Sequence, residues 1–354
     1  GAVMVVGGGV GGMQAALDLA NSGFKVYLVE EGTAIGGRMA QLDKTFPTND
    51  CSMCTISPKL VETGRHLNIQ LMMDSEVMKV DGQAGNFKVT VRHKPRYIDI
   101  SKCTGCSECA QVCPIITPGR FDEGMAQQRA AYKLYPQAVP NAYAIEKRGI
   151  PPCRDACPTG QRAQGYIALI REGRYEEAMR VIKEDNPFPG ICGRICNHRC
   201  EDDCNRNLVD QPLSIANLKR FVTDQVYKQP YIPPDPLPYQ FGEKVAIIGA
   251  GPCGLTAAKD LRKLGYPITI FEALPVAGGM LRVGVPDYRL PPSIVDREVR
   301  EIIDLGIDLR LNTPVNNLDD IMKEGFKAVL IAVGAHEGRK LPIPGTDLPE
   351  VLIN

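Results

Sequence analysis

Four cysteines followed by a proline form the most specific chemical pattern in the chain. Cys103, Cys106, Cys109 and Cys113 precede Pro114 in a C-x2-C-x2-C-x3-C-P run. Thiolates at this spacing hold a [4Fe–4S] cluster, and in proteins with two such runs the fourth cysteine serves the other cluster. This chain has no second copy of the run. The pattern therefore predicts a cluster at residues 103–113 that takes a ligand from elsewhere in the chain.

Cys51 and Cys54 are the obvious source for that missing ligand. They form a C-x2-C pair some fifty residues upstream of the run. The same spacing occurs in redox-active dithiols, whose thiolate pKa is lowered by the local environment. We interpret the pair as cluster ligands, with a redox dithiol as the alternative.

Six further cysteines form a second group. Two segments with helical periodicity, 164–172 and 175–184, separate its two ends, and Gly173 breaks the pattern between them. A helical hairpin would bring both ends together, and no regular helix is expected over 192–204. The group supplies one [4Fe–4S] cluster with two spare cysteines, or shares in two clusters with outside ligands; zinc is the alternative metal. Its members are Cys153, Cys157, Cys192, Cys196, Cys200 and Cys204.

A strand, a glycine loop, a helix and a second strand form a unit that occurs twice. In the first copy, strand 3–6 leads into glycine run 7–12, a helix to Ala20 and strand 26–29. The second copy has its strands at 245–248 and 268–271, an offset of 242 residues. The landmarks Gly7, Gly9, Gly12, Glu30, Gly36 and Gly37 recur as Gly249, Gly251, Gly254, Glu272, Gly278 and Gly279.

Each copy meets the physical requirements of a dinucleotide site. The three loop glycines permit a tight turn, close approach of the pyrophosphate and close helix–strand packing. The phosphates would lie at a helix N-terminus, and Glu30 or Glu272 would accept hydrogen bonds from the ribose. The Gly-Gly pair that follows resembles the extended motif of two-dinucleotide-binding flavoproteins, so FAD is favoured over NAD at both sites. Cys253, inside the second loop, is interpreted as a packing residue.

Length and composition agree with a chain of two or three domains. The chain has 354 residues, and its 41 basic and 41 acidic side chains cancel, which gives no support to nucleic-acid binding. No apolar stretch reaches the length of a membrane span and no signal peptide is evident, so a cytoplasmic location is expected. The proline-rich stretch 229–242 is expected to be an extended linker.

These elements predict an α/β fold. It comprises two Rossmann-like FAD-binding units, an inserted ferredoxin-like segment and a small helical iron–sulfur domain. The predicted divisions are 1–98 for the first FAD unit, 99–148 for the inserted segment, 149–228 for the helical domain, 229–242 for the linker and 243–354 for the second, incomplete FAD unit.

Three stretches carry a first family resemblance, together with the cysteine run. They are IGGRMAQLDKTFPTNDC at 35–51, SPKLVE at 57–62 and YPQAVP at 135–140. With them, residues 1–148 resemble the flavin-binding part of the A subunit of heterodisulfide reductase. The resemblance implies FAD, and flavin-based electron bifurcation as the family's chemistry. Arg38 lies beside the expected flavin and is a candidate to bind it, with a phosphate or structural contact as the alternative.

A second resemblance covers residues 151–354. It rests on the second cysteine group, LKRF at 218–221, the second glycine loop, GGMLRVGVP at 278–286 and the Val333-Gly334 turn. Here the chain is similar to the small chain of glutamate synthase and its relatives. This resemblance implies further FAD contacts at Met280, Leu281, Gly284 and Gly334.

The chain departs from both families. The first family closes its flavin domain with another strand and turn after the insert, whereas this chain passes directly into the second family near Gly149. The second family continues with a pyridine-nucleotide domain beyond the region of Gly334, and has a C-x2-C upstream that is missing here. We expect either a fragment of a longer protein or completion of both flavin domains by another polypeptide.

Three functions are consistent with these patterns. The favoured hypothesis is an electron-transfer subunit of a larger cytoplasmic complex, relaying electrons between FAD and [4Fe–4S] clusters. Its partners would be other redox subunits, with ferredoxin or hydrogenase- and dehydrogenase-type donors. The first alternative is an NAD(P)H-dependent reductase subunit of the glutamate synthase small-chain type, which needs a nicotinamide domain outside this chain. The second is a non-catalytic iron–sulfur scaffold. No catalytic acid, base or nucleophile is evident.

Overall fold

The computed structural model describes residues 1–336, 338 and 342–349. It divides into two compact units, Gly1–Gly149 and Ile150–Asn354. The finer division into five segments remains a prediction.

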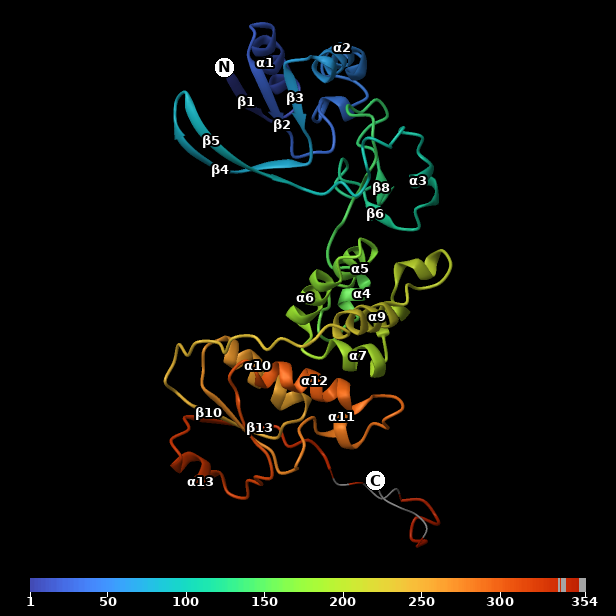
Figure 1. Cartoon of the computed structure of the whole chain (residues 1–354). Coiled ribbons are helices and arrows are strands. Elements are labelled where there is room, and N and C mark those ends of the chain that lie inside the picture. Colours follow the sequence, from blue (N-terminus) through green and yellow to red (C-terminus); the bar gives the residue numbers. More distant parts are fainter. Residues whose placement is uncertain (337, 339–341, 350–354) are drawn as a thin grey trace. The chain divides into compact units, whose positions relative to one another are not determined.

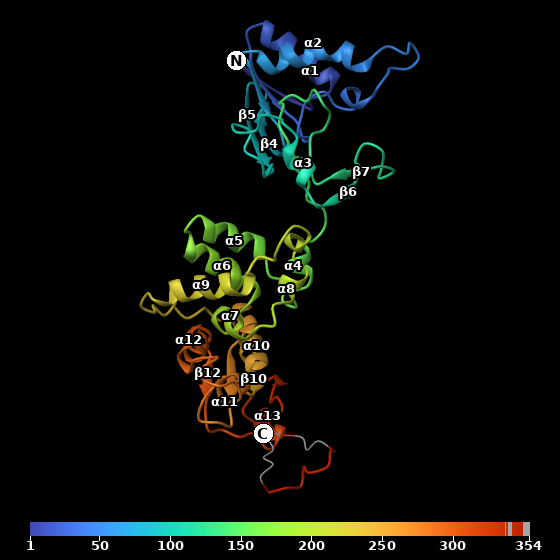
Figure 2. The ribbon, with the colours of Figure 1, turned by 90° about the vertical axis from the view of Figure 1, so that its right-hand side faces the viewer.

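The first unit is built on a three-stranded parallel sheet in the order β1-β2-β3. β1 (Ala2–Val6), β2 (Lys25–Val29) and β3 (Ile69–Met72) are covered by α1 (Val10–Asn21) and α2 (Ser52–Arg65), which lie side by side (Figure 2). Apolar residues of α1 such as Met13 and Leu17 pack against Leu28 of β2 and Leu60 of α2 in one core. The short 3-10 helix η1 (Met39–Gln41) precedes α2.

A hairpin and an irregular segment complete the first unit. The hairpin pairs β4 (Ser75–Gln83) with β5 (Asn86–His93) in antiparallel register. The segment after it contains α3 (Glu108–Val112) and two small antiparallel pairs, β6 (Ile116–Pro118) with β7 (Gln127–Arg129) and β8 (Ala131–Tyr132) with β9 (Ala144–Ile145).

Arg96 joins this segment to the loops that follow β2 and β3 of the parallel sheet. Its side chain is only 5% exposed, and its guanidinium donates to the carbonyls of Thr33, Ala142 and Tyr143 and to the Asp74 carboxylate. The Arg96–Asp74 ion pair spans 3.1 Å. Removing one partner of a buried, fully hydrogen-bonded ion pair lowers the stability of the fold far more than removing one partner of a surface pair does. Arg96 is therefore the clamp that holds the inserted segment in place.

The second unit contains the second copy of the repeat in a four-stranded parallel sheet ordered β12-β11-β10-β13. Its strands are β10 (Val245–Ile248), β11 (Ile268–Phe271), β12 (Asp308–Arg310) and β13 (Ala328–Ile331). Helices α10 (Pro252–Lys263) and α12 (Pro292–Ile303) pack on one face, and α13 (Leu318–Lys323) lies on the other (Figure 1). The short α11 (Met280–Val283) follows the Gly-Gly turn.

The two sheets share strand register at the 242-residue offset. Val3 lies opposite Val26 in the first sheet, and Val245 lies opposite Ile268 in the second. The predicted strands therefore form and pair as expected, and the α/β character is confirmed.

The sheets differ at one edge. β10 pairs with both β11 and β13, whereas β1 pairs with β2 alone within Gly1–Gly149. Val6 is consequently 66% exposed, while the equivalent Ile248 is 8% exposed. The structure thus bears out the expectation that the first copy has no counterpart to the 328–334 strand and turn among its described residues.

A helical region precedes the second sheet. It contains α4 (Pro152–Asp155), the hairpin of α5 (Ala163–Arg171) and α6 (Tyr175–Asp185), and α9 (Ile215–Tyr227). The hairpin matches the prediction. The expectation of no helix over 192–204 was wrong, because α7 (Pro189–Ile195) and α8 (Arg199–Asp202) are helical, with a break at Cys196–His198; the 3-10 helix η2 (Asn205–Leu208) follows.

The proline-rich stretch is extended, as predicted, but it packs on the second sheet's helices. Leu237 donates its N–H to the Leu305 carbonyl, and Arg262 donates to carbonyls of Leu237 and Pro238. Tyr231 donates its hydroxyl to Asp304 at 2.8 Å. These contacts tie the stretch to α10 and α12 rather than leaving it a free tether.

Within the described residues, none of the helices has the length and apolar character needed to cross a bilayer.

Substituting Arg96 tests its role as the clamp. Removing one partner of a buried ion pair costs about 3–5 kcal/mol, so Arg96→Met should release the inserted segment. Limited proteolysis with mass spectrometry should then find faster cleavage within residues 97–148. Arg92→Met is the matched control, because Arg92 makes an exposed ion pair with Glu76. Equal protection in Arg96→Met and the native chain would show that other contacts hold the segment.

Candidate dinucleotide and cysteine sites

Each glycine loop is closed by direct packing of a helix on the turn that precedes it. A Cβ placed on Gly12 would lie 1.8 Å from the Gly7 carbonyl oxygen, and one on Gly254 would lie 2.0 Å from that of Gly249. Both loops therefore require glycine at this position, because any side chain would force the helix N-terminus away. Gly9 and Gly251 stand before their helices, and a Cβ on either would meet no atom closer than about 4 Å. That open space leaves room for a phosphate.

The two glutamates predicted to bind ribose occupy equivalent places. Glu30 accepts hydrogen bonds from Gly8 N at 2.6 Å and Gly32 N at 2.7 Å. Glu272 accepts them from Ala250 N at 2.7 Å and Leu274 N at 2.9 Å. Each carboxylate thus fixes its own glycine loop. Because each oxygen has a further lone pair, both remain able to accept hydrogen bonds from ribose hydroxyls.

The Gly-Gly turns close over the loops in the same way in both copies. Gly36 donates its N–H to the Gly8 carbonyl at 2.7 Å, and Gly278 donates to that of Ala250 at 2.8 Å. A Cβ on Gly37 or Gly279 would lie 3.1 or 2.9 Å from the Cα of Gly9 or Gly251. The structure therefore brings all twelve repeat landmarks together as two sets of six.

A cavity of about 820 Å³ opens at the second loop. It is mostly apolar, and the Glu272 carboxylate lies on its wall. Gly249, Gly251, Gly279, Met280 and Gly334 also line it, as the sequence predicted for an FAD site. The size, the glycine cradle and the acid fit a dinucleotide.

Four residues predicted to bind FAD in the second unit are not on that cavity wall: Gly254, Gly278, Leu281 and Gly284. Leu281 packs into the core, and a Cβ on Gly284 would clash with Met280 at 2.3 Å, so Gly284 supports Met280. Cys253 is not the packing residue that the sequence predicted, because its side chain is exposed and lines the cavity. The equivalent Gly11 has open space beyond its Cα, which explains why no small residue is required there.

The first copy has a polar hollow of about 520 Å³ beside its acid. Glu30 and Gly32 line it together with Lys94, Arg96 and Arg120 from the hairpin and inserted segment. Arg38 lies elsewhere, on the surface. Its guanidinium donates to the Phe121 carbonyl at 3.2 Å and lies 3.9 Å from the Glu123 carboxylate, which are structural contacts. Flavin binding by Arg38 remains a prediction.

Three cysteines of the first run are close neighbours. Burial raises the pKa of the Cys109 thiol, and repulsion from the thiolates of Cys103 and Cys106 adds to this effect. Tyr143 donates its N–H to the Cys103 sulfur at 3.4 Å, a contact of the kind that tunes cluster potentials. Cys113 follows α3, and its carbonyl accepts from Arg129.

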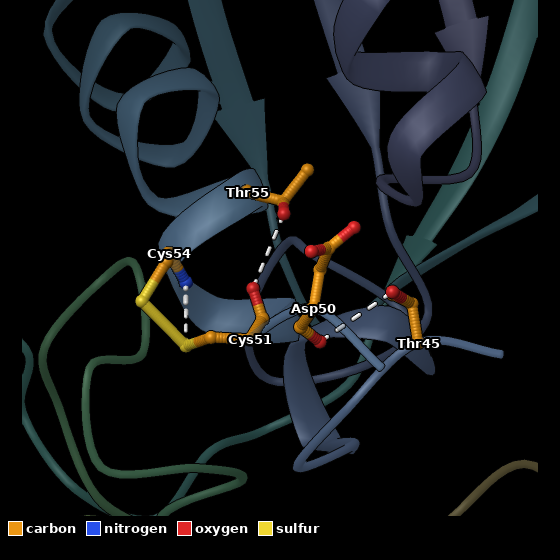
Figure 3. The surroundings of a disulfide bond; sticks show 5 residues. All are labelled: Thr45, Asp50, Cys51, Cys54 and Thr55. Carbon is orange, nitrogen blue, oxygen red and sulfur yellow. Dashed lines mark hydrogen bonds between the residues drawn. A yellow bond between two sulfur atoms is a disulfide. The ribbon is translucent and has the colours of Figure 1, made fainter. Parts of the chain in front are cut away.

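Cys51 and Cys54 are joined by a disulfide bond at the start of α2 (Figure 3). Cys51 is the N-cap residue, and its sulfur accepts the Cys54 N–H at 3.2 Å. This is the dithiol alternative in its oxidised form, in which neither sulfur is a free thiolate. Ligation of a cluster by this pair remains a prediction that concerns its reduced form.

Four cysteines of the second group surround one hollow between α4, α5, α8 and α9. Cys153, Cys157, Cys196 and Cys200 line it, together with Lys219. Cys204 is a neighbour of Cys153, whose pKa is raised by burial and by repulsion from Cys204. Cys192 does not line the hollow; its side chain packs against the core of the second sheet, and its thiol lies 3.7 Å from the Asn186 side-chain oxygen. The hairpin thus brings the two ends of the group together, as predicted.

The surroundings shift the pKa values of these thiols in opposite directions. Burial raises the pKa of Cys200 to about 11, and the Lys219 ammonium opposes that shift. Burial also acts against the Cys157 thiolate, but hydrogen bonds from Thr159 and Gln161, together with Lys219, give a net lowering of its pKa. Among the described residues no three His, Cys, Asp or Glu side chains converge enough to hold a single metal ion, but an iron–sulfur cube is wider than one ion.

Glu298 is a buried acid that sequence analysis missed. It lies on α12 and accepts hydrogen bonds from the N–H groups of Gly190 and Ile191 in α7 and from the Tyr227 hydroxyl. Burial raises its pKa to about 7. Glu298 therefore connects the Cys192 helix to the dinucleotide unit. No local signal marks it, because its partners lie more than seventy residues away in sequence.

The tight packing of the glycine loops predicts that alanine at Gly12 or Gly254 removes bound flavin, whereas alanine at Gly11 does not. Gly12→Ala places a methyl group against the Gly7 carbonyl and should remove about one flavin per chain, since the helix start must shift. Gly254→Ala should remove the other. Gly11→Ala is the control, because its Cβ has open space and alanine favours the helix. Flavin released on denaturation gives the count; full retention in Gly12→Ala would contradict the account.

The raised pKa of Glu298 predicts that the free energy of unfolding of the chain depends on pH. Its folded pKa of about 7 lies above the usual 4.5 of a free carboxyl, so the stability it contributes is complete below about pH 4.5 and lost as pH rises through 7. The loss is about 3 kcal/mol. Thermal unfolding of the apo-chain by circular dichroism should show a smaller fall between pH 5 and 7.5 for Glu298→Gln than for the native chain. The exposed Glu176→Gln serves as control, and parallel profiles for Glu298→Gln and the native chain would refute the assignment.

Three family models match the chain. The pyridine nucleotide-disulphide oxidoreductase model matches residues 1–104 and 243–352, which is more than half of the chain. The 4Fe-4S binding domain model matches residues 96–115, and the model of dihydropyrimidine dehydrogenase domain II, 4Fe-4S cluster, matches 136–231. These matches indicate FAD binding and [4Fe–4S] clusters, and they confirm iron–sulfur over zinc as the family's chemistry.

Two curated relatives confirm the two resemblances. The second iron-sulfur A subunit of CoB–CoM heterodisulfide reductase from Methanopyrus kandleri is 58% identical over 142 residues, which cover 40% of this chain and 22% of that protein. The beta subunit of NADP(+)-dependent formate dehydrogenase from Moorella thermoacetica is 41% identical over 220 residues, which cover 55% and 31%. The chain thus spans less than a third of either relative.

One solved structure is similar over a shorter region. FprA of Mycobacterium tuberculosis in complex with NADPH is 31% identical, with 32% of this chain and 26% of that chain covered and a TM-score of 0.27. The family assignment rests instead on the match at 1–104 and 243–352, which coincides with the two glycine-loop units. The chain belongs to the pyridine nucleotide-disulphide oxidoreductase family.

Proposed function

We propose that the chain is an electron-transfer flavoprotein subunit of a multi-subunit oxidoreductase. The observation that carries the proposal is the presence, in one chain, of two equivalent glycine-loop and acid units beside two clustered sets of cysteines. The relatives support it, because both are named as subunits of larger redox enzymes.

FAD would be held at two Rossmann-like units. In each, the loop glycines admit the pyrophosphate, the acid binds ribose and the Gly-Gly turn closes over the loop. The cavity beside Glu272 receives the second FAD, with Met280 and Gly334 on its wall. The residues assigned to the first site are Gly7, Gly9, Gly12, Glu30, Gly36 and Gly37, and those of the second are their equivalents at 249–279.

Cysteines would hold at least two [4Fe–4S] clusters. Cys103, Cys106 and Cys109 would bind the first, for which Cys51 or Cys54 supplies the fourth ligand when reduced. Cys113 holds the position that serves another cluster in proteins with two such runs. For the second, we assign Cys153, Cys157, Cys196 and Cys200, because these four line one hollow. Cys192 and Cys204 are then the two spare members of that group.

Bound FAD exchanges electrons in pairs or singly, whereas a [4Fe–4S] cluster exchanges them singly, so a chain holding both converts one kind of transfer into the other. The protein's own contribution is positional. Glu298 fixes α7 against α12, and α12 in turn packs Val295 against Gly278 of the turn over the second dinucleotide loop. The cysteine region and the second FAD unit are thereby held in one compact body.

The relatives' names favour two finer functions. One such relative, the A subunit of the H(2):CoB-CoM heterodisulfide,ferredoxin reductase of Methanothermobacter marburgensis, is 58% identical over 144 residues and favours splitting of an electron pair between two acceptors. The beta subunit of NADP(+)-dependent formate dehydrogenase favours NAD(P)H as an electron source, delivered through a domain other than those described here. In either case the partners are other redox subunits of the same complex.

Serine substitution of two cysteines tests the ligand assignment and the relay together. Cys157→Ser should lose about four iron atoms per chain and slow the bleaching of flavin near 450 nm by a one-electron donor at least tenfold. Cys192→Ser is the matched control and should keep its iron, because Cys192 faces the core. Anaerobic iron analysis and stopped-flow absorbance make the comparison. Loss of iron from Cys192→Ser with retention in Cys157→Ser would reverse the assignment, and unchanged bleaching in an iron-depleted Cys157→Ser chain would contradict the relay.

A further inference from the structure

Lys219 is a buried cation on α9. It is 7% exposed, in a helix whose other buried residues are Ile215, Val222 and Thr223. Its ammonium donates to the Gln161 side-chain oxygen at 3.3 Å, and Gln161 is itself buried and fixed by donating to the Ile182 carbonyl. The amide orientation is therefore determined, with its oxygen toward the lysine.

The ammonium has no carboxylate partner within the part of the chain that the structure describes. Twenty-four ion pairs are formed there, and Lys219 takes part in none of them. Burial of a charge beside a neutral amide alone is costly, so such a cation requires an anion nearby.

The groups that share its hollow identify that anion. Lys219 lines the same hollow as Cys153, Cys157, Cys196 and Cys200. Four thiolates around an iron–sulfur cube leave it with net negative charge. The other basic side chains at this hollow, Arg199 and His198, are exposed to solvent and screened.

We propose that Lys219 is the buried countercharge of the cluster held by Cys153, Cys157, Cys196 and Cys200, and that it sets the reduction potential of that cluster. The proposal rests on the proposed function, because it needs a cluster in this hollow. Reduction adds one electron from an external donor and no atoms, so the reduced state is more negative by one charge. A fixed cation stabilises that state more than the oxidised one, and it raises the potential.

Two variants remove the charge by different routes. Lys219→Met deletes the ammonium at similar volume, and Gln161→Glu leaves it in place but neutralises it with a carboxylate. Both should lower the midpoint potential of the cluster, whereas Lys219→Arg should keep it near the native value. Lys259→Met is the matched control, because Lys259 is equally buried in the same unit but donates to the Lys183 carbonyl and does not line the hollow of these four cysteines.

The measurement is an anaerobic redox titration of the full chain with dithionite, followed by electron paramagnetic resonance. The signal that shifts should be the one that Cys157→Ser abolishes, while the signal of the other cluster stays in place. Iron content and the melting temperature of the chelator-treated chain are measured in parallel. Without a cluster the buried ammonium is destabilising, so the apo form of Lys219→Met should melt at or above the native apo temperature.

The outcomes distinguish failure of the countercharge role of Lys219 from failure of the proposed electron-transfer function. A lower midpoint in Lys219→Met or Gln161→Glu supports the countercharge, as does loss of iron from Lys219→Met with an undiminished apo melting temperature. Native iron content with an unchanged midpoint overturns it, and so does loss of iron with a lowered apo melting temperature, which would make Lys219 a packing residue. Absence of iron from the native chain would refute the proposed function itself.

Discussion

The structure depends on a contact that leaves no room for a side chain. At Gly12 and again at Gly254, a helix begins directly against the carbonyl of the turn that precedes it. Close approach there aims the helix N-terminus at the space beyond Gly9 or Gly251 and allows the acid at the end of the next strand to reach the loop. The paired strands, the glycine loop and the acid therefore form one structural unit, and the chain contains that unit twice.

Outside this contact the two copies differ. The second has β13 beside β10 and a large cavity at its loop, whereas within Gly1–Gly149 β1 pairs with β2 alone and Glu30 faces a polar hollow lined in part by the inserted segment. Polar contacts made over long sequence distances bind the added parts to each copy. Arg96 clamps the inserted segment to the first sheet, and Glu298 fixes the cysteine helices to the second.

Sequence was sufficient for features with a local pattern. The repeat landmarks, the strands 245–248 and 268–271 and the α5–α6 hairpin could be predicted because periodicity and glycine spacing are written in adjacent residues. Arg96, Glu298 and Lys219 could not be, since each acquires its role from partners distant in sequence. The spacing of four at 192–204 fits both a helix and irregular turns, and only packing against α9 and α12 decides that α7 forms. Cys253 was misjudged because its neighbour Gly254, and not Cys253 itself, occupies the tight position.

The most direct test is the cofactor content of the native chain, purified without oxygen. Flavin, iron, sulfide and zinc per chain, together with the visible spectrum, decide whether both dinucleotide units and both cysteine sets are functional. We expect about two FAD and about eight or more iron atoms per chain, with flavin absorption near 450 nm. Zinc in place of iron, or a chain that binds no flavin, would contradict it.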